Sequence, residues 1–127
     1  MYDAKADVSR NLVIATLAGY LTEEDATAAA DLVIAESNKL KPGFICITDL
    51  STFKPVSTVA AEQITRTVKH IAEKGVAVTV RIIGNAITDL QFKRTYREGG
   101  ATYDVVQVRT MEEAMEYVAE RSARMAD

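Results

Sequence analysis

Residues 47–57, ITDLSTFKPVS, bring together side chains that could take part in chemistry. Hydroxyls and a carboxylate crowd around a lysine and a proline there: Asp49, Ser51, Thr52, Ser57 and Thr58 surround Lys54 and Pro55. A carboxylate can move protons in a catalytic site, and a hydroxyl can accept a phosphoryl group. The same residue types also end strands, build loops and cap helices. The segment is therefore either a catalytic or regulatory loop or a strand-to-helix junction.

Two interpretations of this junction are open. Structurally, Asp49 closes a strand and Pro55 keeps Lys54 out of a helix. Ser57 or Thr58 then caps the helix that follows. Functionally, the same hydroxyls lie where a parallel strand's carboxyl end meets a helix N-terminus, which is where open α/β sheets bind ligands and helix dipoles favour anions. A phosphate on Ser57 or Thr58 would add about −1.5 to −2 charges at that helix cap.

Three residues outside this junction also invite a chemical interpretation. His70, the one histidine of the chain, falls on the polar side of a predicted helix, where a solvated side chain without a positioned partner is the usual case. Cys46 falls within an apolar strand, where cysteine behaves as a small buried hydrophobe. Arg81 interrupts another apolar strand, and it either extends to solvent at the sheet's end or reaches Asp49 or Asp89.

Sequence signatures of common catalytic and cofactor sites are absent. The chain has no Gly-x-Gly-x-x-Gly, Walker loop or Gly-x-Ser-x-Gly elbow, and no Cys/His cluster that would hold zinc. Catalysis would need four separated residues to converge in one cleft: Asp49, Ser57, Arg81 and His70. The basic cluster KRTYR (93–97) either complements a helix C-terminus or holds an anion. We expect no enzymatic activity, no cofactor and no metal.

Length and composition favour a single globular domain over residues 1–127. A net charge of −3 argues against a nucleic-acid surface and against a polybasic membrane anchor. The lone Cys46 fits a reducing compartment. The first ten residues lack the apolar core of a signal peptide, and no apolar run reaches the roughly 18 residues of a membrane helix. We therefore expect a cytoplasmic protein with no integral membrane segment.

Hydropathy patterns predict an α/β fold with the order β-β-α-β-α-β-α-β-α. Apolar alternation or apolar runs predict strands over 2–8, 12–19, 44–50, 76–84 and 103–108. Helices are expected from the Thr22 cap to about Asn38, from residue 58 to Gly75, over 86–97 and after the Thr110 cap. Because helices alternate with strands, the sheet should be mostly parallel, with the first strand antiparallel at an edge.

The residue patterns of two segments resemble those of a known family. ITDLSTFKPVS resembles the third-strand region of STAS domains, in which an apolar strand, Asp-Leu-Ser, an apolar residue and a short loop precede Asp-Ser-Ser-Gly at a helix start. VVQVRTMEEAMEYV resembles the last strand, hydroxyl cap and Glu-Ala helix of SpoIIAA-like proteins, a bacterial group related to STAS domains. The layout is similar over essentially the whole chain. The resemblance implies a (βα) superhelical fold and a role in binding or regulation rather than catalysis.

The resemblance also bears on phosphorylation. In anti-sigma-factor antagonists, a kinase phosphorylates the serine that follows the aspartate at the start of the second helix. Residues 49–51 (Asp-Leu-Ser) match that pattern directly, so Ser57 falls at the aspartate and Thr58 at the phosphorylated serine. Val-Ala at 59–60 replaces Ser-Gly, and the acidic neighbour is missing. Thr58 is therefore expected to act primarily as a helix cap, with phosphorylation of Thr58 or Ser57 as the alternative.

The leading hypothesis is a cytoplasmic binding or regulatory module of the SpoIIAA/STAS-like type. Its contact surface would be the 49–58 loop, the start of the second helix and residues 84–89, with binding by Asp49, Ser51, Lys54, Ser57 and Thr58. The alternative is a carrier of an apolar or amphiphilic small molecule, since SpoIIAA-like proteins also resemble CRAL-TRIO lipid-transfer domains. An alanine-rich first helix and the Phe92/Tyr96 pair would leave or line such a cavity. A strand edge or helix face would also support a homodimer, but the sequence does not show which one.

Overall fold

A computed structural model describes residues 1–54, 57–84 and 103–126 of the chain, without the side chains of 124–126. The strands are β1 (Tyr2–Asp7), β2 (Leu12–Leu17), β3 (Ile45–Leu50), β4 (Val78–Ile83) and β5 (Asp104–Val108). The helices are α1 (Glu23–Ser37), α2 (Thr58–Lys74) and α4 (Met111–Ala126), with a 3₁₀ helix at Val8–Arg10. Several predictions lie outside the described residues: the 86–97 helix, the 93–97 cluster, and the roles of Pro55, Asp89, Phe92 and Tyr96.

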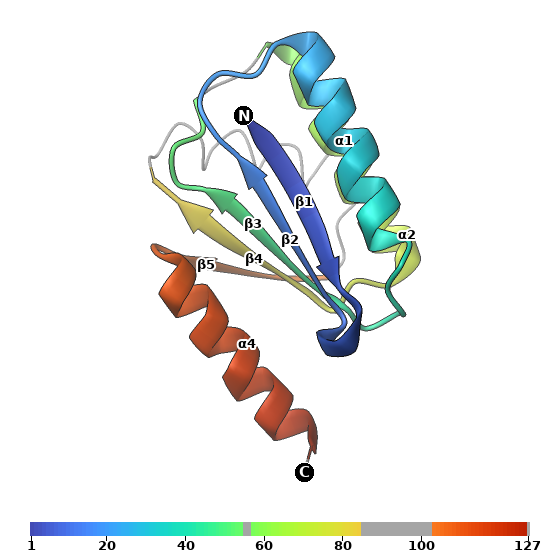
Figure 1. Ribbon diagram of the computed structural model, residues 1–127, viewed down its shortest axis with the longest axis vertical. Coiled ribbons are helices and arrows are strands. Elements are labelled where there is room, and N and C mark those ends of the chain that lie inside the picture. Colours follow the sequence, from blue (N-terminus) through green and yellow to red (C-terminus); the bar gives the residue numbers. More distant parts are fainter. Residues whose placement is uncertain (55–56, 85–102, 127) are drawn as a thin grey trace.

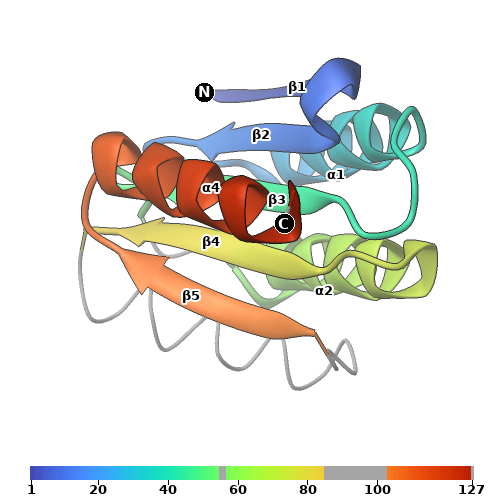
Figure 2. The same cartoon turned by 90° about the horizontal axis from the view of Figure 1, so that it is seen from below.

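The strands form one sheet in the order β1-β2-β3-β4-β5. β1 is antiparallel to β2, and every following pair is parallel. Because the connections from β2 to β3 and from β3 to β4 are crossovers of the same hand, α1 and α2 lie together on one face (Figure 1). Figure 2 shows α4 on the opposite face, in front of the sheet, with α1 and α2 behind it. The predicted mostly parallel sheet with an antiparallel edge strand is confirmed.

Both faces of the central strands are covered, which explains their nearly continuous apolar sequences. On the α4 side, buried residues of three strands pack with two residues of the helix: Leu12, Ile45, Ile47, Val78, Val80 and Ile82 with Ala114 and Val118. On the other side, Leu17 and Leu50 pack with Ala29 and Val68. β1 differs, because its α4-side residues Asp3 and Lys5 are exposed.

Hydroxyl caps begin all three described helices. Thr22 Oγ1 accepts from the Asp25 amide at 3.1 Å, and Thr110 Oγ1 accepts from the Glu113 amide at 3.1 Å, as predicted. The α2 cap is Ser57, whose Oγ accepts from the Ala60 amide at 3.2 Å.

The expectation that Thr58 caps α2 is wrong. Ser57 has the extended backbone of a cap, with φ −64° and ψ 164°, and this directs its side chain back over the first turn. Thr58 is already the first helical residue. Gly75 ends the helix with φ 93°, a conformation that disfavours residues with a side chain.

Candidate functional site

The loops after β2 and β3 are joined at the carboxyl end of the parallel strands. The Gly19 amide donates to the Thr52 carbonyl at 2.9 Å, and the Lys54 amide donates to the Gly19 carbonyl at 3.0 Å. These bonds form a parallel bridge between Gly19 and Phe53. The two loops therefore prolong the sheet beyond β2 and β3, at the position where open α/β sheets bind ligands.

The start of the loop after β4 meets the same place. A Cβ atom on Gly84 would overlap the carbonyl oxygen of Ser51, so this approach requires glycine. Of the predicted 84–89 contribution, Gly84 is the part that lies within the described residues. Three loops thus converge, and we call the surface formed by residues 19–22, 51–54, 57–59 and 84 the carboxyl edge.

Asp49 organises the loop after β3. Its Oδ1 accepts from the Ser51 amide at 3.1 Å and from the Ser51 hydroxyl at 2.8 Å. Both donors of Ser51 are therefore engaged by one carboxylate oxygen, in the manner of an Asx turn. Asp49 is half-buried and Ser51 is exposed. β3 itself ends one residue later, at Leu50, and Asp49 holds the turn that follows it.

The carboxyl edge has a buried apolar base beneath an exposed rim. Phe53 is 1% exposed and packs in one cluster with Leu17 and Leu21. Above it Tyr20 is 62% exposed and Val59 is 47% exposed. Tyr20 was not among the site residues predicted from the sequence, although an aromatic side chain in a short loop after a strand was a usable signal.

The predicted rim residues are accessible. Lys54, Ser57 and Thr58 are all exposed. Ser57 is committed to the α2 cap, whereas the Thr58 hydroxyl makes no hydrogen bond to any described residue. Because α1 and α2 both begin here, the positive ends of two helix dipoles lie at the carboxyl edge.

Arg81 does not join this surface. It is 4% exposed in the middle of β4, in register with Thr48 on β3 and Gln107 on β5. Asp49 is in register with Ile82, the next residue along, so its side chain projects from the opposite face of the sheet. The predicted contact of Arg81 with Asp49 is therefore wrong, and so is its extension to solvent; Asp89 lies outside the described residues.

His70 lies at the other end of the parallel strands. α2 runs back from the carboxyl edge, so its later residues approach the amino end of the sheet. His70 is half-buried, and its Nε2 lies 2.8 Å from Oδ1 of Asn38, the residue that follows α1. The structure therefore places His70 beside an amide and does not bring it together with Asp49, Ser57 or Arg81.

Cys46 is a buried residue of the sheet, as predicted. Burial raises the pKa of its thiol to about 11, although a contact with Thr48 opposes that shift. The Sγ atom lies 3.7 Å from Thr48 Oγ1. A thiol with this pKa stays protonated near neutral pH and is a poor nucleophile.

Two small apolar cavities lie between the sheet and the helices α1 and α2. One, of about 30 Å³, is lined by Leu17, Leu21, Ala26, Ala29, Ala30, Val33, Gln63 and Ile64. The other, of about 50 Å³, is lined by Ala15, Leu17, Val33, Cys46, Thr48, Ile64, Thr67, Val68 and Ile71. The two cavities share three lining residues, and the short alanine side chains of α1 leave this space unfilled. Each is well below the roughly 150 Å³ cavity that accepts benzene.

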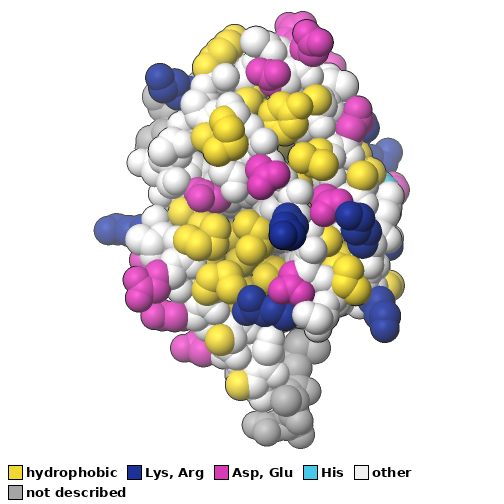
Figure 3. All heavy atoms as spheres, in the orientation of Figure 1, with side chains coloured by type: hydrophobic (Ala, Val, Ile, Leu, Met, Phe, Trp, Pro, Cys, Tyr) yellow, Lys and Arg dark blue, Asp and Glu magenta, His cyan; other side chains and the backbone are white. Residues whose placement is uncertain are grey.

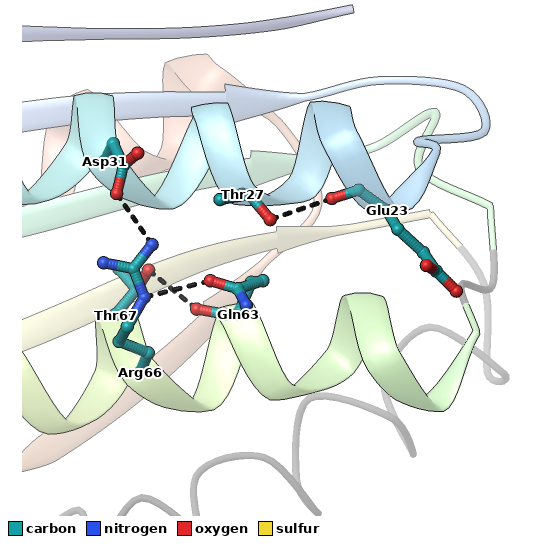
Figure 4. A network of polar contacts seen from close by, with 6 residues as sticks. All are labelled: Glu23, Thr27, Asp31, Gln63, Arg66 and Thr67. Carbon is teal, nitrogen blue, oxygen red and sulfur yellow. Dashed lines mark hydrogen bonds and ion pairs between the residues drawn. The ribbon is translucent and has the colours of Figure 1, made fainter.

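A polar network joins α1 and α2 beside these cavities (Figure 4). Arg66 Nη2 on α2 lies 2.8 Å from Asp31 Oδ1 on α1, and Arg66 Nε donates to Gln63 Oε1 at 2.9 Å. Gln63 also lines the smaller cavity, and its carbonyl accepts from Thr67, which lines the larger one. Any enlargement of the cavities by separation of α1 and α2 would break the Arg66–Asp31 pair.

Neither a metal-ligand cluster nor a membrane-spanning helix occurs in the part of the chain that the structure describes. Across 1–54, 57–84 and 103–126, no group of three or more His, Cys, Asp or Glu side chains is placed to hold a metal ion. None of the helices in this part of the chain combines the length and the apolar character needed to span a membrane.

Comparison with known proteins addresses the fold. The sequence matches no protein-family profile and no curated protein. The structure is similar to the crystal structure of an uncharacterized protein of the DUF3478 family, with a SpoIIAA-like fold, from Shewanella loihica PV-4. The TM-score is 0.69 at 13% sequence identity, over 92% of this chain and 93% of the other. The chain therefore has the SpoIIAA-like fold that its order of elements and its resemblance to STAS-related proteins predicted.

Proposed function

We propose that the protein is a non-enzymatic binding or regulatory module and that a protein partner contacts its carboxyl edge. The observation that carries this proposal is the convergence of three loops that are held together by backbone contacts and display exposed side chains. A surface fixed in this way loses little conformational entropy when a partner binds. An exposed tyrosine and valine beside a lysine and hydroxyls combine an apolar anchor with polar groups, which is a common composition of protein interfaces.

Thr58 is the better placed of the two candidate phosphoacceptors. Its hydroxyl is exposed and makes no hydrogen bond to a described residue, whereas Ser57 Oγ caps α2. A phosphate on Thr58 would lie in the first turn of α2, where the helix dipole stabilises negative charge. It would also change the charge at the centre of the carboxyl edge, so phosphorylation would regulate partner binding.

The absence of catalysis is part of the proposal. Its support is the wide separation of the residues that a catalytic cleft would need, because Arg81 and Asp49 project from opposite faces and His70 lies at the opposite end of the strands. We also propose a cytoplasmic location, on the ground that the lone cysteine of the chain is a buried free thiol.

A second candidate function is the carriage of a small apolar molecule. The specific observation in its favour is the pair of adjacent apolar cavities that share Leu17, Val33 and Ile64. In this conformation they are too small for a lipid chain, so a carrier would have to separate α1 from α2. This candidate predicts an apolar ligand bound to the purified protein.

Site-specific photo-crosslinking in cells tests the proposed contact surface. A photoreactive phenylalanine analogue replaces Tyr20 in one variant and Val8 in a control, since Val8 is 60% exposed but lies after β1, at the opposite end of the sheet. We expect one protein crosslinked from position 20 and not from position 8. Its purified form should then bind the wild type and lose about tenfold or more in affinity for a Tyr20→Ala, Val59→Ser double variant, as expected when central anchors are truncated.

Equal binding to the wild type and to the double variant would contradict the proposed surface. Native mass spectrometry of the protein purified from cells separates the two candidate functions. The bare chain mass is expected for the binding module. Leu17→Phe places a larger side chain where the two cavities meet. A co-purified apolar molecule that is lost in this variant would support the carrier instead.

A further inference from the structure

β1 is an edge strand, so one side of its backbone pairs with no other described strand. It pairs with β2 on one side. The reciprocal bonds of Met1 with Ala18 show that odd-numbered residues of β1 bond toward β2. The amides of Tyr2, Ala4 and Ala6 therefore point away from the sheet. Such a row of outward amides and carbonyls can pair with another strand.

The outer side of β1 carries charges of both signs on one face. Asp3, Lys5 and Asp7 project toward the α4 side, in a minus-plus-minus order. Asp7 is committed to the turn that follows, because its Oδ1 accepts from Ser9 Oγ at 2.8 Å and from the Arg10 amide. Asp3 and Lys5 are exposed and make no ion pair with any described residue.

The other face of the same edge is apolar. Ala4 is buried and packs in one cluster with Val33 and the half-buried Leu32 of α1. Leu32 and the half-buried Ala28 lie one helical turn apart on α1, which packs along β1. Figure 3 views the molecule from the β1 side and shows acidic and basic side chains interspersed beside apolar patches.

We propose that β1 pairs antiparallel with β1 of a second copy of this chain, about a two-fold axis that passes at Ala4. Charge complementarity selects this register. An axis at Asp3 or at Lys5 would place identical charges directly opposite each other, which is destabilising. An axis at Ala4 places Asp3 opposite Lys5 of the second copy, and by symmetry it does so twice.

An axis at Ala6 is excluded by the chain itself. It would oppose Ala4 to Val8, but Val8 begins the 3₁₀ helix and has left the strand. With the axis at Ala4, the paired residues are Tyr2 to Ala6, all within β1. The α1 helices would then flank the joint, with Leu32 of each copy near the axis, and would cover the apolar face of the joined sheet.

Glu36 opposes this pairing in the free chain. Its Oε1 accepts from the outward Ala6 amide at 3.0 Å, and its other oxygen pairs with Lys39. One edge amide is thereby occupied, as expected of a device that limits edge-to-edge association. Dimerisation requires Glu36 to release Ala6, so Glu36 sets the balance between monomer and dimer.

Sedimentation equilibrium over a concentration series tests the proposal with charge-swap variants. Lys5→Asp or Asp3→Lys alone should raise the dimer dissociation constant by about tenfold or more, because each change places like charges opposite each other twice. The double variant Asp3→Lys/Lys5→Asp should restore the wild-type constant. Glu36→Ala should lower the constant by about tenfold, because two copies each lose a competing hydrogen bond. Lys69→Asp, an exposed change on α2, is the matched control and should have no effect.

A register measurement completes the test. A carbodiimide links a carboxylate to an amine in contact, so a mixture of ¹⁴N- and ¹⁵N-labelled chains should give an Asp3–Lys5 peptide that contains both labels. A protein that stays monomeric even as Glu36→Ala overturns the proposal. So does a dimer that the double swap fails to restore or that lacks the mixed-label peptide. Circular dichroism verifies that each exposed substitution leaves the fold intact.

Discussion

The two ends of the parallel strands are built differently. At the amino end, the connecting segments are sealed by buried apolar residues, with Leu40, Phe44 and Val76 all at most 7% exposed. Hydrogen bonds also join separate segments there, for example the bond from the Gly43 amide to the Gly75 carbonyl at 2.7 Å. At the carboxyl edge, a single buried aromatic, Phe53, supports exposed residues that the fold does not need to cover. The amino end therefore contributes mainly to stability, whereas the carboxyl edge presents the exposed surface that we propose binds a partner.

The largest expected effect compares one buried phenylalanine from each end. Phe44→Ala and Phe53→Ala should each lower the free energy of unfolding by about 3–5 kcal/mol, because each leaves a cavity in a packed cluster. Urea denaturation measures the loss. Under conditions where both variants stay folded, Phe44→Ala should bind the carboxyl-edge partner normally and Phe53→Ala should not. Equal loss of binding in both variants would remove the distinction between the ends.

An alkaline titration probes the buried layer between the two ends. The folded pKa of Cys46 is about 11, above the ordinary value of 9.0, so the folded chain retains a proton that the unfolded chain loses. This stabilisation is fully present below pH 9 and is lost as the pH rises to 11, a decrease of about 2–3 kcal/mol. Denaturation at several pH values should show a decline that is absent from Cys46→Ala. Parallel curves for the two proteins would contradict the burial of the thiol.

Gly84→Ala tests the convergence of the loops at the carboxyl edge. The added methyl group would overlap the Ser51 carbonyl, so the free energy of unfolding should fall by about 2 kcal/mol, in the range of overpacked sites. Gly43→Ala at the amino end is the control for backbone strain, because its added Cβ meets nothing within 4 Å although φ is 91°. We expect Gly84→Ala to weaken partner binding as well as stability, and Gly43→Ala to change stability alone.

The smallest effect separates the two hydroxyls at the start of α2. Ser57→Ala removes the cap and should cost about 1 kcal/mol of stability. Thr58→Ala, at an exposed helical position, should change stability by less than about 0.5 kcal/mol. If the two losses were reversed, Thr58 would be the cap after all. A Thr58→Glu variant should instead alter partner binding, because it adds negative charge to the carboxyl edge.

The sequence predicted the local elements well because their signals act over short distances. The caps at Thr22 and Thr110 and the stop at Gly75 depend on neighbouring amides within one helical turn. The apolar run of β3 indicated burial on both faces. Thr58 was wrongly favoured as the cap because adjacent hydroxyls are equivalent in sequence, and backbone angles distinguish them.

What the sequence determined by itself was the order of strands and helices, the parallel sheet with its antiparallel edge, and a shortage of catalytic signatures. Tertiary structure alone decided which distant groups meet. Strand register placed Arg81 and Asp49 on opposite faces, and the crossover of α2 carried His70 to the far end of the sheet. The close approach of Gly84 to Ser51 likewise joins segments that are remote in sequence. Periodicity and capping are properties of consecutive residues, whereas a binding surface depends on contacts between loops that form only when the sheet is assembled.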